Sequence, residues 1–154
     1  MKYDLHVHTY YSDGLYSPTK VVDYAIEKGL DGIAITDHDS VMGIEEALLY
    51  SKKFNGFNII PGIELSCTYD NREVHILGYF IDYRDEKILS VTKDLRENRK
   101  ERVRKIVEKL NALNIKIDIK NIKDKSNNEF TGRVAIAREL INIGYTSTIQ
   151  EDYD

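Results

Sequence analysis

The first 64 residues of this chain alternate between strand-like and helix-like patterns, and this alternation limits the possible folds more than any other feature. Apolar and polar side chains alternate in the predicted strands, and Ser17-Pro18 is a typical helix start. The predicted elements are a strand over 3–8, a helix between Ser17 and Gly29, a strand over 31–36, a helix over 44–54 and a strand over 57–64. This order predicts an α/β fold built on a parallel sheet with right-handed crossovers.

The pattern changes after the third strand, where Asp70-Asn71 separates two strand-like segments, 65–69 and 73–81. Asp and Asn tolerate the positive φ angles of a tight turn, so these segments are predicted to form a hairpin. With those two residues as the loop, Glu64 is a diagonal neighbour of His75 on the same face. The two side chains are then within reach of one shared ion.

Residues 85–154 are predicted to be mainly helical. The expected elements are one or two long helices over 85–113, a polar loop over 123–129 and a final helix over 132–143. The charged run at 96–101 either attracts an anionic substrate or forms a solvated helix face with Glu–Arg and Glu–Lys pairs. We therefore divide the chain into an N-terminal part, residues 1–84, which carries the candidate ligands, and a helical segment, residues 85–154.

Ligand-type side chains gather at the predicted strand ends. His6 and His8, two residues apart on a strand, point the same way, and in α/β folds the strand ends form the binding crevice. Imidazole and carboxylate groups are the usual ligands of zinc, manganese and iron in proteins. The candidate ligands are His6, His8, Asp13, His38, Glu64 and His75. A polar strand face would also explain His-X-His alone, but six such groups at one rim predict a metal site.

Composition argues against several other classes of protein. The formal net charge of −4 does not suit a surface built for tight, non-specific nucleic-acid binding. No apolar run approaches the roughly 20 residues needed to cross a bilayer, so no membrane association is expected. The single cysteine, Cys67, excludes an internal disulfide and fits a reducing compartment, so a cytoplasmic location is expected.

Five motifs occur in order along the first 80 residues. They are His6-Val7-His8-Thr9, Ser12-Asp13-Gly14, Ile35-Thr36-Asp37-His38-Asp39, Pro61-Gly62-Ile63-Glu64 and Val74-His75-Ile76-Leu77-Gly78-Tyr79. Together they resemble the PHP (polymerase and histidinol phosphatase) domain family, and most closely its stand-alone phosphoesterase branch related to the bacterial TrpH/YciV proteins. The segment Phe130-Thr131-Gly132-Arg133 and the helix after it are similar to the inserted helical segment of that branch.

The resemblance implies a distorted (β/α)7 barrel with a helical insert and two or three divalent metal ions (Mn, Fe or Zn). By analogy the first ion takes His6, His8 and Glu64, the second takes Glu64 and His75, and the third takes Asp13 and His38. The last two residues are also candidate catalytic residues. Members of this branch hydrolyse phosphate esters through a metal-activated hydroxide, so the expected partners are a phosphorylated small molecule, a nucleotide or a short oligonucleotide.

The sequence departs from that family pattern in its second half. Such barrels take further ligands from later strands, but this sequence has no histidine after His75, and Val134-Ala135 stands where the branch often has Pro-His. A closed α/β barrel usually needs roughly 200 residues or more, so the later barrel strands are expected to be missing from this chain. The strands present would leave an open sheet edge, which predicts a homo-oligomer or a strand-exchanged assembly.

Supporting roles are predicted for residues beside the candidate ligands. Arg133 is a candidate clamp for the substrate phosphate, or else a surface arginine at a helix start. Asp37 and Asp39 flank His38, and one of them is expected to orient an imidazole, unless Asp39 caps the following helix.

The sequence is compatible with three functions. The first is a metal-dependent phosphoesterase, a phosphoric ester hydrolase. The second is a metal-dependent amidohydrolase, because amidohydrolase barrels also open with His-X-His, although they usually add a carboxylated lysine. The third is an incomplete, non-catalytic metal-binding fragment.

Overall fold

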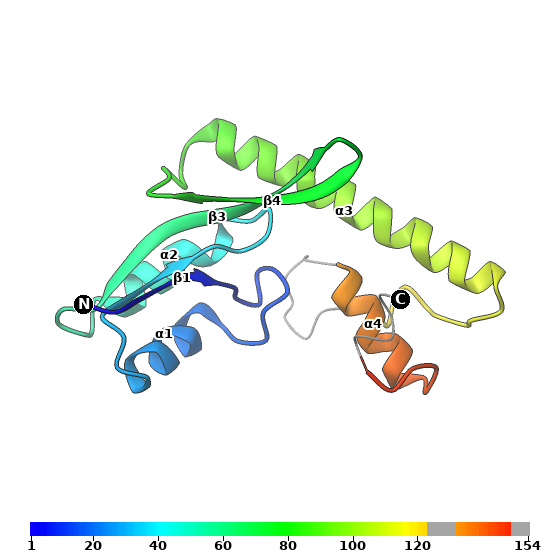
Figure 1. The fold of residues 1–154 in the computed structure, drawn as a ribbon, viewed down its shortest axis with the longest axis horizontal. Helices are drawn as coiled ribbons and strands as arrows, with labels where there is room; N and C mark the ends of the chain where they lie inside the picture. Colours follow the sequence, from blue (N-terminus) through cyan, green and yellow to red (C-terminus); the bar gives the residue numbers. More distant parts are fainter. Residues whose placement is uncertain (123–131, 149–154) are drawn as a thin grey trace. The chain divides into compact units, whose positions relative to one another are not determined.

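A computed structural model describes residues 1–122 and 132–148, which places the predicted loop at 123–129 and Phe130-Thr131 outside the described residues. The chain clusters into two compact units, Met1–Leu95 and Arg96–Asp154. The helices and strands are labelled in Figure 1. They are β1 (Tyr3–Val7), α1 (Pro18–Glu27), β2 (Gly32–Ile35), α2 (Met42–Ser51), β3 (Asn58–Tyr69), β4 (Arg72–Tyr79), α3 (Glu86–Ala112) and α4 (Arg133–Asn142).

The four strands form one sheet in the order β1-β2-β3-β4. β1 pairs with β2 and β2 with β3 in parallel, while β3 and β4 are antiparallel, so the predicted α/β sheet with a returning hairpin is confirmed. Asp70 and Asn71 have φ angles of 49° and 57°, as a tight turn between Tyr69 and Arg72 requires. β1 lies at one edge of the sheet, where the sequence predicts an open edge; the predicted oligomer stays a prediction.

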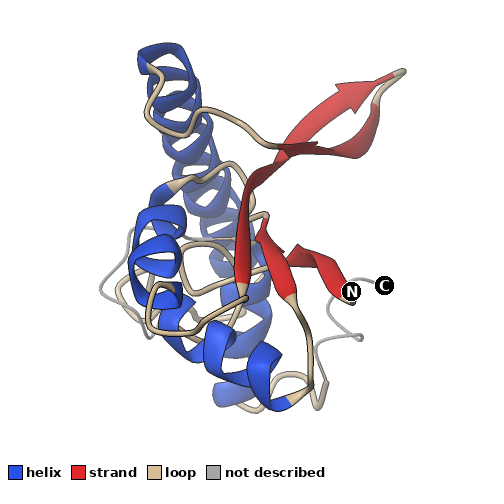
Figure 2. Ribbon diagram, turned by 90° about the vertical axis from the view of Figure 1, so that its left-hand side faces the viewer, coloured by secondary structure: helices blue, strands red, loops and turns tan. Residues whose placement is uncertain are grey.

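β3 is one continuous strand of 12 residues, although the sequence pattern divides it after Glu64. Its first part pairs with β2, and its second part pairs with β4 from Gly62 onward. The hairpin therefore continues beyond the parallel strands, as Figure 2 shows. Because β3 belongs to both pairings, it connects the parallel part of the sheet rigidly to the hairpin.

The core of the first unit lies between the sheet and the helices α1 and α2, which cover one side of it (Figure 2). Ser17 caps α1 by accepting a hydrogen bond from the Lys20 backbone N–H, as predicted. The buried residues that make up this core are Val21, Val22, Ala25, Ile33, Ile35, Val41, Ile44, Ala47 and Ile63. β2 is buried along its whole length, as a strand between two parallel neighbours must be.

α2 differs from its predicted bounds at both ends. It starts at Met42 and ends at Ser51, and its N-cap, Val41, makes no side-chain capping hydrogen bond. Capping of this helix by Asp39 is therefore wrong. The Asp39 carboxylate instead accepts a hydrogen bond from the Ser66 backbone N–H at 2.8 Å, so it links the loop before α2 to β3.

α3 is a single helix of 27 residues and starts in the first unit, which confirms the long helix predicted from residue 85. In the second unit, Arg104 forms ion pairs with Glu101 at 2.7 Å and Glu108 at 2.8 Å, the pattern of a solvated helix face. Val103 and Val107 belong to a second buried cluster with residues of α4. Among the described residues, no helix is both long and apolar enough to cross a membrane.

Candidate metal centre

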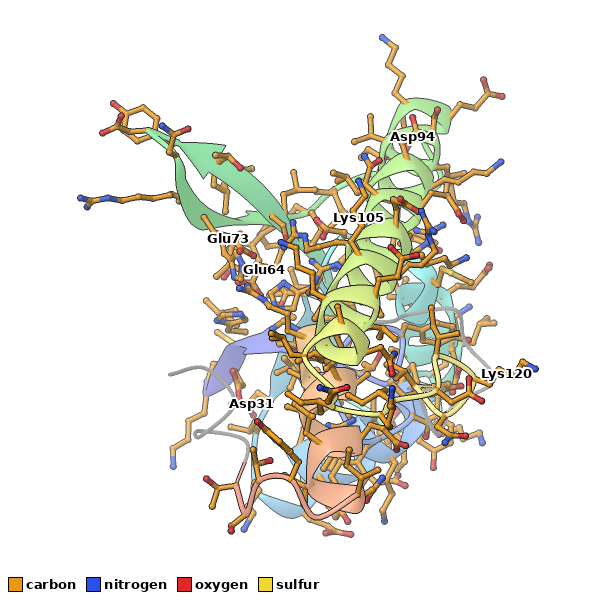
Figure 3. All side chains as sticks on the ribbon, turned by 90° about the vertical axis from the view of Figure 1, so that its right-hand side faces the viewer. Asp31, Glu64, Glu73, Asp94, Lys105 and Lys120 are labelled. Carbon is orange, nitrogen blue, oxygen red and sulfur yellow. The ribbon has the colours of Figure 1, made fainter. Side chains whose placement is uncertain are left out.

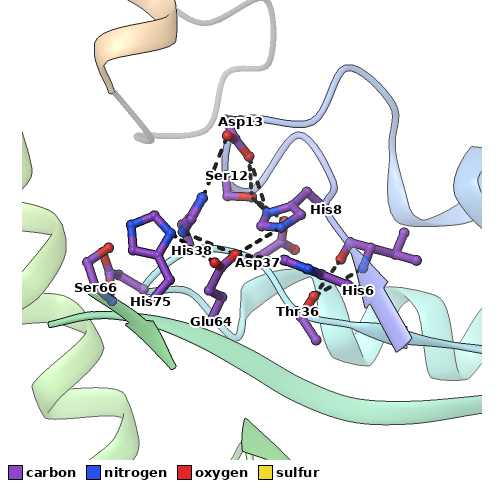
Figure 4. A network of polar contacts seen from close by, with 12 residues as sticks. His6, His8, Ser12, Asp13, Thr36, Asp37, His38, Glu64, Ser66 and His75 are labelled. Carbon is purple, nitrogen blue, oxygen red and sulfur yellow. Dashed lines mark hydrogen bonds and ion pairs between the residues drawn. The ribbon is translucent and has the colours of Figure 1, made fainter. Parts of the chain in front are cut away.

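Glu64, a β3 residue only 4% exposed, lies at the centre of a cluster of imidazole rings. Its Oε2 atom lies within contact distance of three histidines and its Oε1 atom within contact distance of a fourth (Figure 4). The Oε2 distances are 2.9 Å to His6 Nε2, 3.0 Å to His8 Nε2 and 3.4 Å to His38 Nδ1, and Oε1 lies 2.9 Å from His75 Nδ1. The structure thus brings together all four histidines of the sequence around one buried carboxylate.

The parallel pairing of the strands produces this convergence. His8 follows β1, and His38 follows β2 and forms a parallel bridge with Glu64 of β3. The Asp39 backbone N–H donates to the Glu64 carbonyl at 2.9 Å, and the Glu64 N–H donates to the Asp37 carbonyl at 3.3 Å. The chain after β2 therefore runs beside β3, so that the ends of β1 and β2 meet the middle of β3 at one rim.

Asp13 reaches the same cluster from the loop after β1. Its Oδ1 atom lies 3.2 Å from His8 Nδ1, and its Oδ2 atom lies 3.7 Å from His38 Nε2. The loop is folded tightly, because the N–H groups of Ser12 and Gly14 both donate to the Thr9 carbonyl at 3.0 Å. The predicted loop ligand therefore faces two of the predicted histidines (Figure 4).

Asp37 fixes this loop through hydrogen bonds to its side-chain carboxylate. Its fully buried carboxylate accepts hydrogen bonds from the Thr9 N–H at 2.6 Å, the Thr9 hydroxyl at 2.7 Å and the Ser12 hydroxyl at 2.6 Å. The Ser12 hydroxyl also lies 3.3 Å from His8 Nδ1, so Asp37 reaches an imidazole through Ser12. The roles of Thr9 and Ser12 have no signal in the sequence beyond their place inside the two motifs that contain His8 and Asp13.

The charges in the cluster stabilise one another. Burial raises the pKa of Asp13, but the hydrogen bond from His8 and the charges of His38 and His8 lower the pKa to about 2. Burial lowers the pKa of His8, but Asp13 and the nearby carboxylates raise it overall. For Glu64, burial is likewise outweighed by the hydrogen bond from His6 and the charges of its histidine neighbours, so that the pKa is lowered. Both carboxyl groups are therefore ionised near neutral pH.

The donor set fits divalent metal ions. Three groups of side chains each offer ligand atoms within 4.8 Å of one another. They are His6, His8 and Glu64; His8, Asp13 and His38; and His38, Glu64 and His75. Ligand atoms at bond lengths of about 2.1 Å in a tetrahedral shell lie about 3.4 Å apart, which is close to the nitrogen–oxygen distances around Glu64. Arg133, by contrast, is the first residue of α4 in the second unit, and its role as a phosphate clamp stays a prediction.

The loop that holds Asp13 should tolerate no side chain at Gly14. A Cβ atom there would lie 2.5 Å from the His8 carbonyl oxygen and 2.8 Å from the Thr9 carbonyl carbon. We expect Gly14→Ala to lower the free energy of unfolding by about 1–3 kcal/mol and to weaken zinc binding, because the loop must open. Urea unfolding and zinc titration would measure both effects. Gly78→Ala is the control, because its nearest neighbour would be 3.5 Å away, and equal losses in the two variants would contradict the prediction.

Comparisons with known proteins identify the family of this chain. The PHP domain family matches residues 4–136. The chain is 35% identical over 146 residues to a 5′-3′ exoribonuclease of Haemophilus influenzae, across 95% of this chain and 53% of that protein. It is 33% identical over 142 residues to a 3′,5′-nucleoside bisphosphate phosphatase of Chromobacterium violaceum, across 92% of this chain and 50% of that protein. The chain thus spans about half the length of these relatives.

Among solved structures, an amidohydrolase from Chromobacterium violaceum, with bound sulfate and no metal, has a TM-score of 0.91 and 30% sequence identity. The match covers 99% of this chain and 54% of that chain, which confirms the predicted fold as part of a PHP barrel. The ordered motifs and the convergence of their side chains on Glu64 agree with the family match over residues 4–136. The chain belongs to the PHP domain family.

Proposed function

We propose that this chain carries the metal centre of a phosphoesterase that hydrolyses phosphate esters of nucleotides or short oligonucleotides. The observation that supports this most is the arrangement of four imidazoles and a second carboxylate, Asp13, around the buried Glu64. The names of the relatives agree, since one is a bisphosphate phosphatase and another an exoribonuclease. In such a site the reaction needs no serine or cysteine nucleophile from the protein.

The ligands would be shared among two or three ions. His6, His8 and Glu64 are proposed for one ion and Glu64 with His75 for a second, while Asp13 and His38 are proposed for a third. Bound divalent ions lower the pKa of a water molecule to near 7 and neutralise charge on phosphoryl oxygens. Manganese, iron and zinc all accept this imidazole and carboxylate set, and we propose one of these three.

The residues of the chain have separate tasks in this proposal. Glu64, because it is buried and ionised, holds the imidazoles of separate strands around one point. Asp13 and His38 are proposed as the catalytic pair. Asp13, with a pKa of about 2, is ionised near neutral pH, so it can hold an ion or accept a hydrogen bond but has no proton to donate. Arg133 is proposed to bind the substrate phosphate through paired N–H groups.

Two other functions are tested by the same experiments. The likeness to a structure described as an amidohydrolase makes amide hydrolysis the second candidate. A non-catalytic metal-binding chain is the third. A cytoplasmic location, suggested by the single cysteine, and assembly with another chain at the edge of the sheet are further predictions.

The full chain, loaded in turn with Mn²⁺, Fe²⁺ or Zn²⁺, should release phosphate from a nucleoside 3′,5′-bisphosphate or nucleotides from a short RNA. EDTA and His8→Ala should each abolish activity and metal content together, because the site loses its ions. Arg133→Ala should raise KM or lower kcat while the metal content, measured by mass spectrometry, stays unchanged.

Hydrolysis that persists in EDTA and in His8→Ala would refute the metal-dependent mechanism. Stoichiometric metal without hydrolysis of any phosphate ester would favour the non-catalytic reading, and cleavage of amides alone would favour the amidohydrolase.

A further inference from the structure

His75 has a carboxylate facing each of its ring nitrogens, as His8 and His38 also have, but one of the two carboxylates at His75 belongs to none of the candidate metal groups. Nδ1 lies 2.9 Å from Glu64 Oε1, and Nε2 lies 3.3 Å from Glu73 Oε1. Figure 3 shows Glu64 and Glu73 on the same side of the hairpin. Glu73 is not among the candidate metal ligands, and it lies on the outer side of the imidazole.

The hairpin holds this arrangement in a fixed register. Glu73 and His75 are two residues apart on β4, so their side chains leave the same face of the strand. His75 pairs with Ser66 of β3, and the Ser66 backbone N–H is held by the Asp39 carboxylate at 2.8 Å. The backbone position of His75 is therefore set by the sheet, and the direction of its ring is left to side-chain contacts.

The Glu73 contact bears on which nitrogen of the neutral His75 ring carries the proton. The ring carries one N–H, and the other nitrogen offers the lone pair that binds a metal. Glu64 and Glu73 both face this ring, and an ionised carboxylate can only accept a hydrogen bond. If a metal ion takes the lone pair of Nδ1 beside Glu64, the proton of His75 lies on Nε2, where Glu73 can accept a hydrogen bond from it at 3.3 Å. The lone pair then lies on Nδ1, the atom that faces Glu64. At His6 and His8 the opposite nitrogen, Nε2, faces Glu64.

We propose that Glu73 is a positioning residue, which holds His75 with its proton on Nε2 so that Nδ1 is the metal-binding atom. This inference rests on the proposed metal centre. Carboxylate partners of this kind orient metal-binding histidines and raise their basicity, and their loss typically weakens metal binding 10- to 100-fold. Glu73 and His75 have 31% and 36% of their side chains exposed, so the contact lies at the rim of the site, where packing alone orients a ring poorly.

Zinc titration of the full chain by calorimetry tests the proposal. Glu73→Ala should raise the zinc Kd about 10- to 100-fold. Glu73→Gln should lose less, because its amide oxygen can still accept the hydrogen bond from Nε2. Asp70→Asn is the matched control: it also removes one negative charge from the hairpin, and Asn tolerates the φ angle of 49° at that position. Its Kd should equal that of the parent.

A second readout concerns the His75 ring itself. Nitrogen-15 NMR of the zinc-loaded parent should show the proton on Nε2 and zinc on Nδ1. In Glu73→Ala, part of the His75 population should carry the proton on Nδ1. The proposal is overturned by a parent with the proton on Nδ1, by Glu73→Ala with parental Kd, or by Asp70→Asn losing as much as Glu73→Ala. A parent that binds no zinc would instead overturn the proposed metal centre, and this inference with it.

Discussion

Glu64→Gln should abolish tight metal binding while leaving the chain folded. Both Glu64 oxygens face imidazole nitrogens, whereas glutamine is neutral and has a single acceptor oxygen. Loss of a supporting carboxylate alone weakens metal binding by up to about 100-fold, so loss of the central ligand should weaken it further. Metal content by mass spectrometry and zinc affinity by calorimetry would measure the effect, and circular dichroism would confirm the fold.

Glu139→Gln is the matched control for this variant. Glu139 is also a buried carboxylate, 7% exposed, but it lies on α4 in the second unit. The control should keep the metal content of the parent. Stoichiometric metal with parental affinity in Glu64→Gln would show that Glu64 is not the centre of the site.

Asp37→Ala, a substitution after β2, should strongly destabilise the loop that carries Asp13. It leaves three buried donors, on Thr9 and Ser12, without their acceptor. An unsatisfied buried donor costs about 1–3 kcal/mol. We expect the free energy of unfolding to fall by about 3–5 kcal/mol, because removal of the buried charge offsets part of the cost of the three donors. The offset arises because burial raises the pKa of Asp37, which means that the ionised carboxylate is itself costly to bury. Urea unfolding followed by circular dichroism would give the free energy.

Two further variants calibrate this result. Asp37→Asn keeps one acceptor oxygen and should lose less than Asp37→Ala. Asp23→Ala removes one partly buried hydrogen bond, from the Tyr50 hydroxyl at 2.9 Å, and should cost about 1 kcal/mol. If Asp37→Ala costs no more than Asp23→Ala, the loop does not depend on the buried carboxylate.

The local pattern was sufficient to predict the parallel strands, the hairpin and six of the residues at the site. Alternation of apolar and polar residues places His6 and His8 on one face of a strand, because side chains of a strand alternate by geometry. Asp70 and Asn71 identify the turn for an equally local reason, their tolerance of positive φ. From the turn the hairpin register follows, and with it the meeting of Glu64 and His75.

The supporting contacts could not be predicted in the same way. The sequence predicts that Asp37 or Asp39 orients an imidazole. The Asp37 carboxylate accepts hydrogen bonds from Thr9 and Ser12, 28 and 25 residues earlier, and it reaches the His8 ring through Ser12. The sequence also offers Asp39 as a helix cap, but its carboxylate accepts a hydrogen bond from the Ser66 N–H, 27 residues later. Each of these side chains could act on a sequence neighbour, but the packing of distant segments places its hydrogen-bond donors elsewhere in the chain.

The sequence by itself determined which chemical groups this protein brings to its site and which strands and loops carry them. The tertiary structure alone decided that Glu64 is the centre of the cluster and that Glu73 faces the outer nitrogen of His75. The physical reason is that hydrophobic alternation and turn preference act over a few residues, whereas hydrogen bonds to a buried carboxylate depend on distances between strands. Those distances are set when the sheet packs against α1 and α2, and they have no signature in the local sequence.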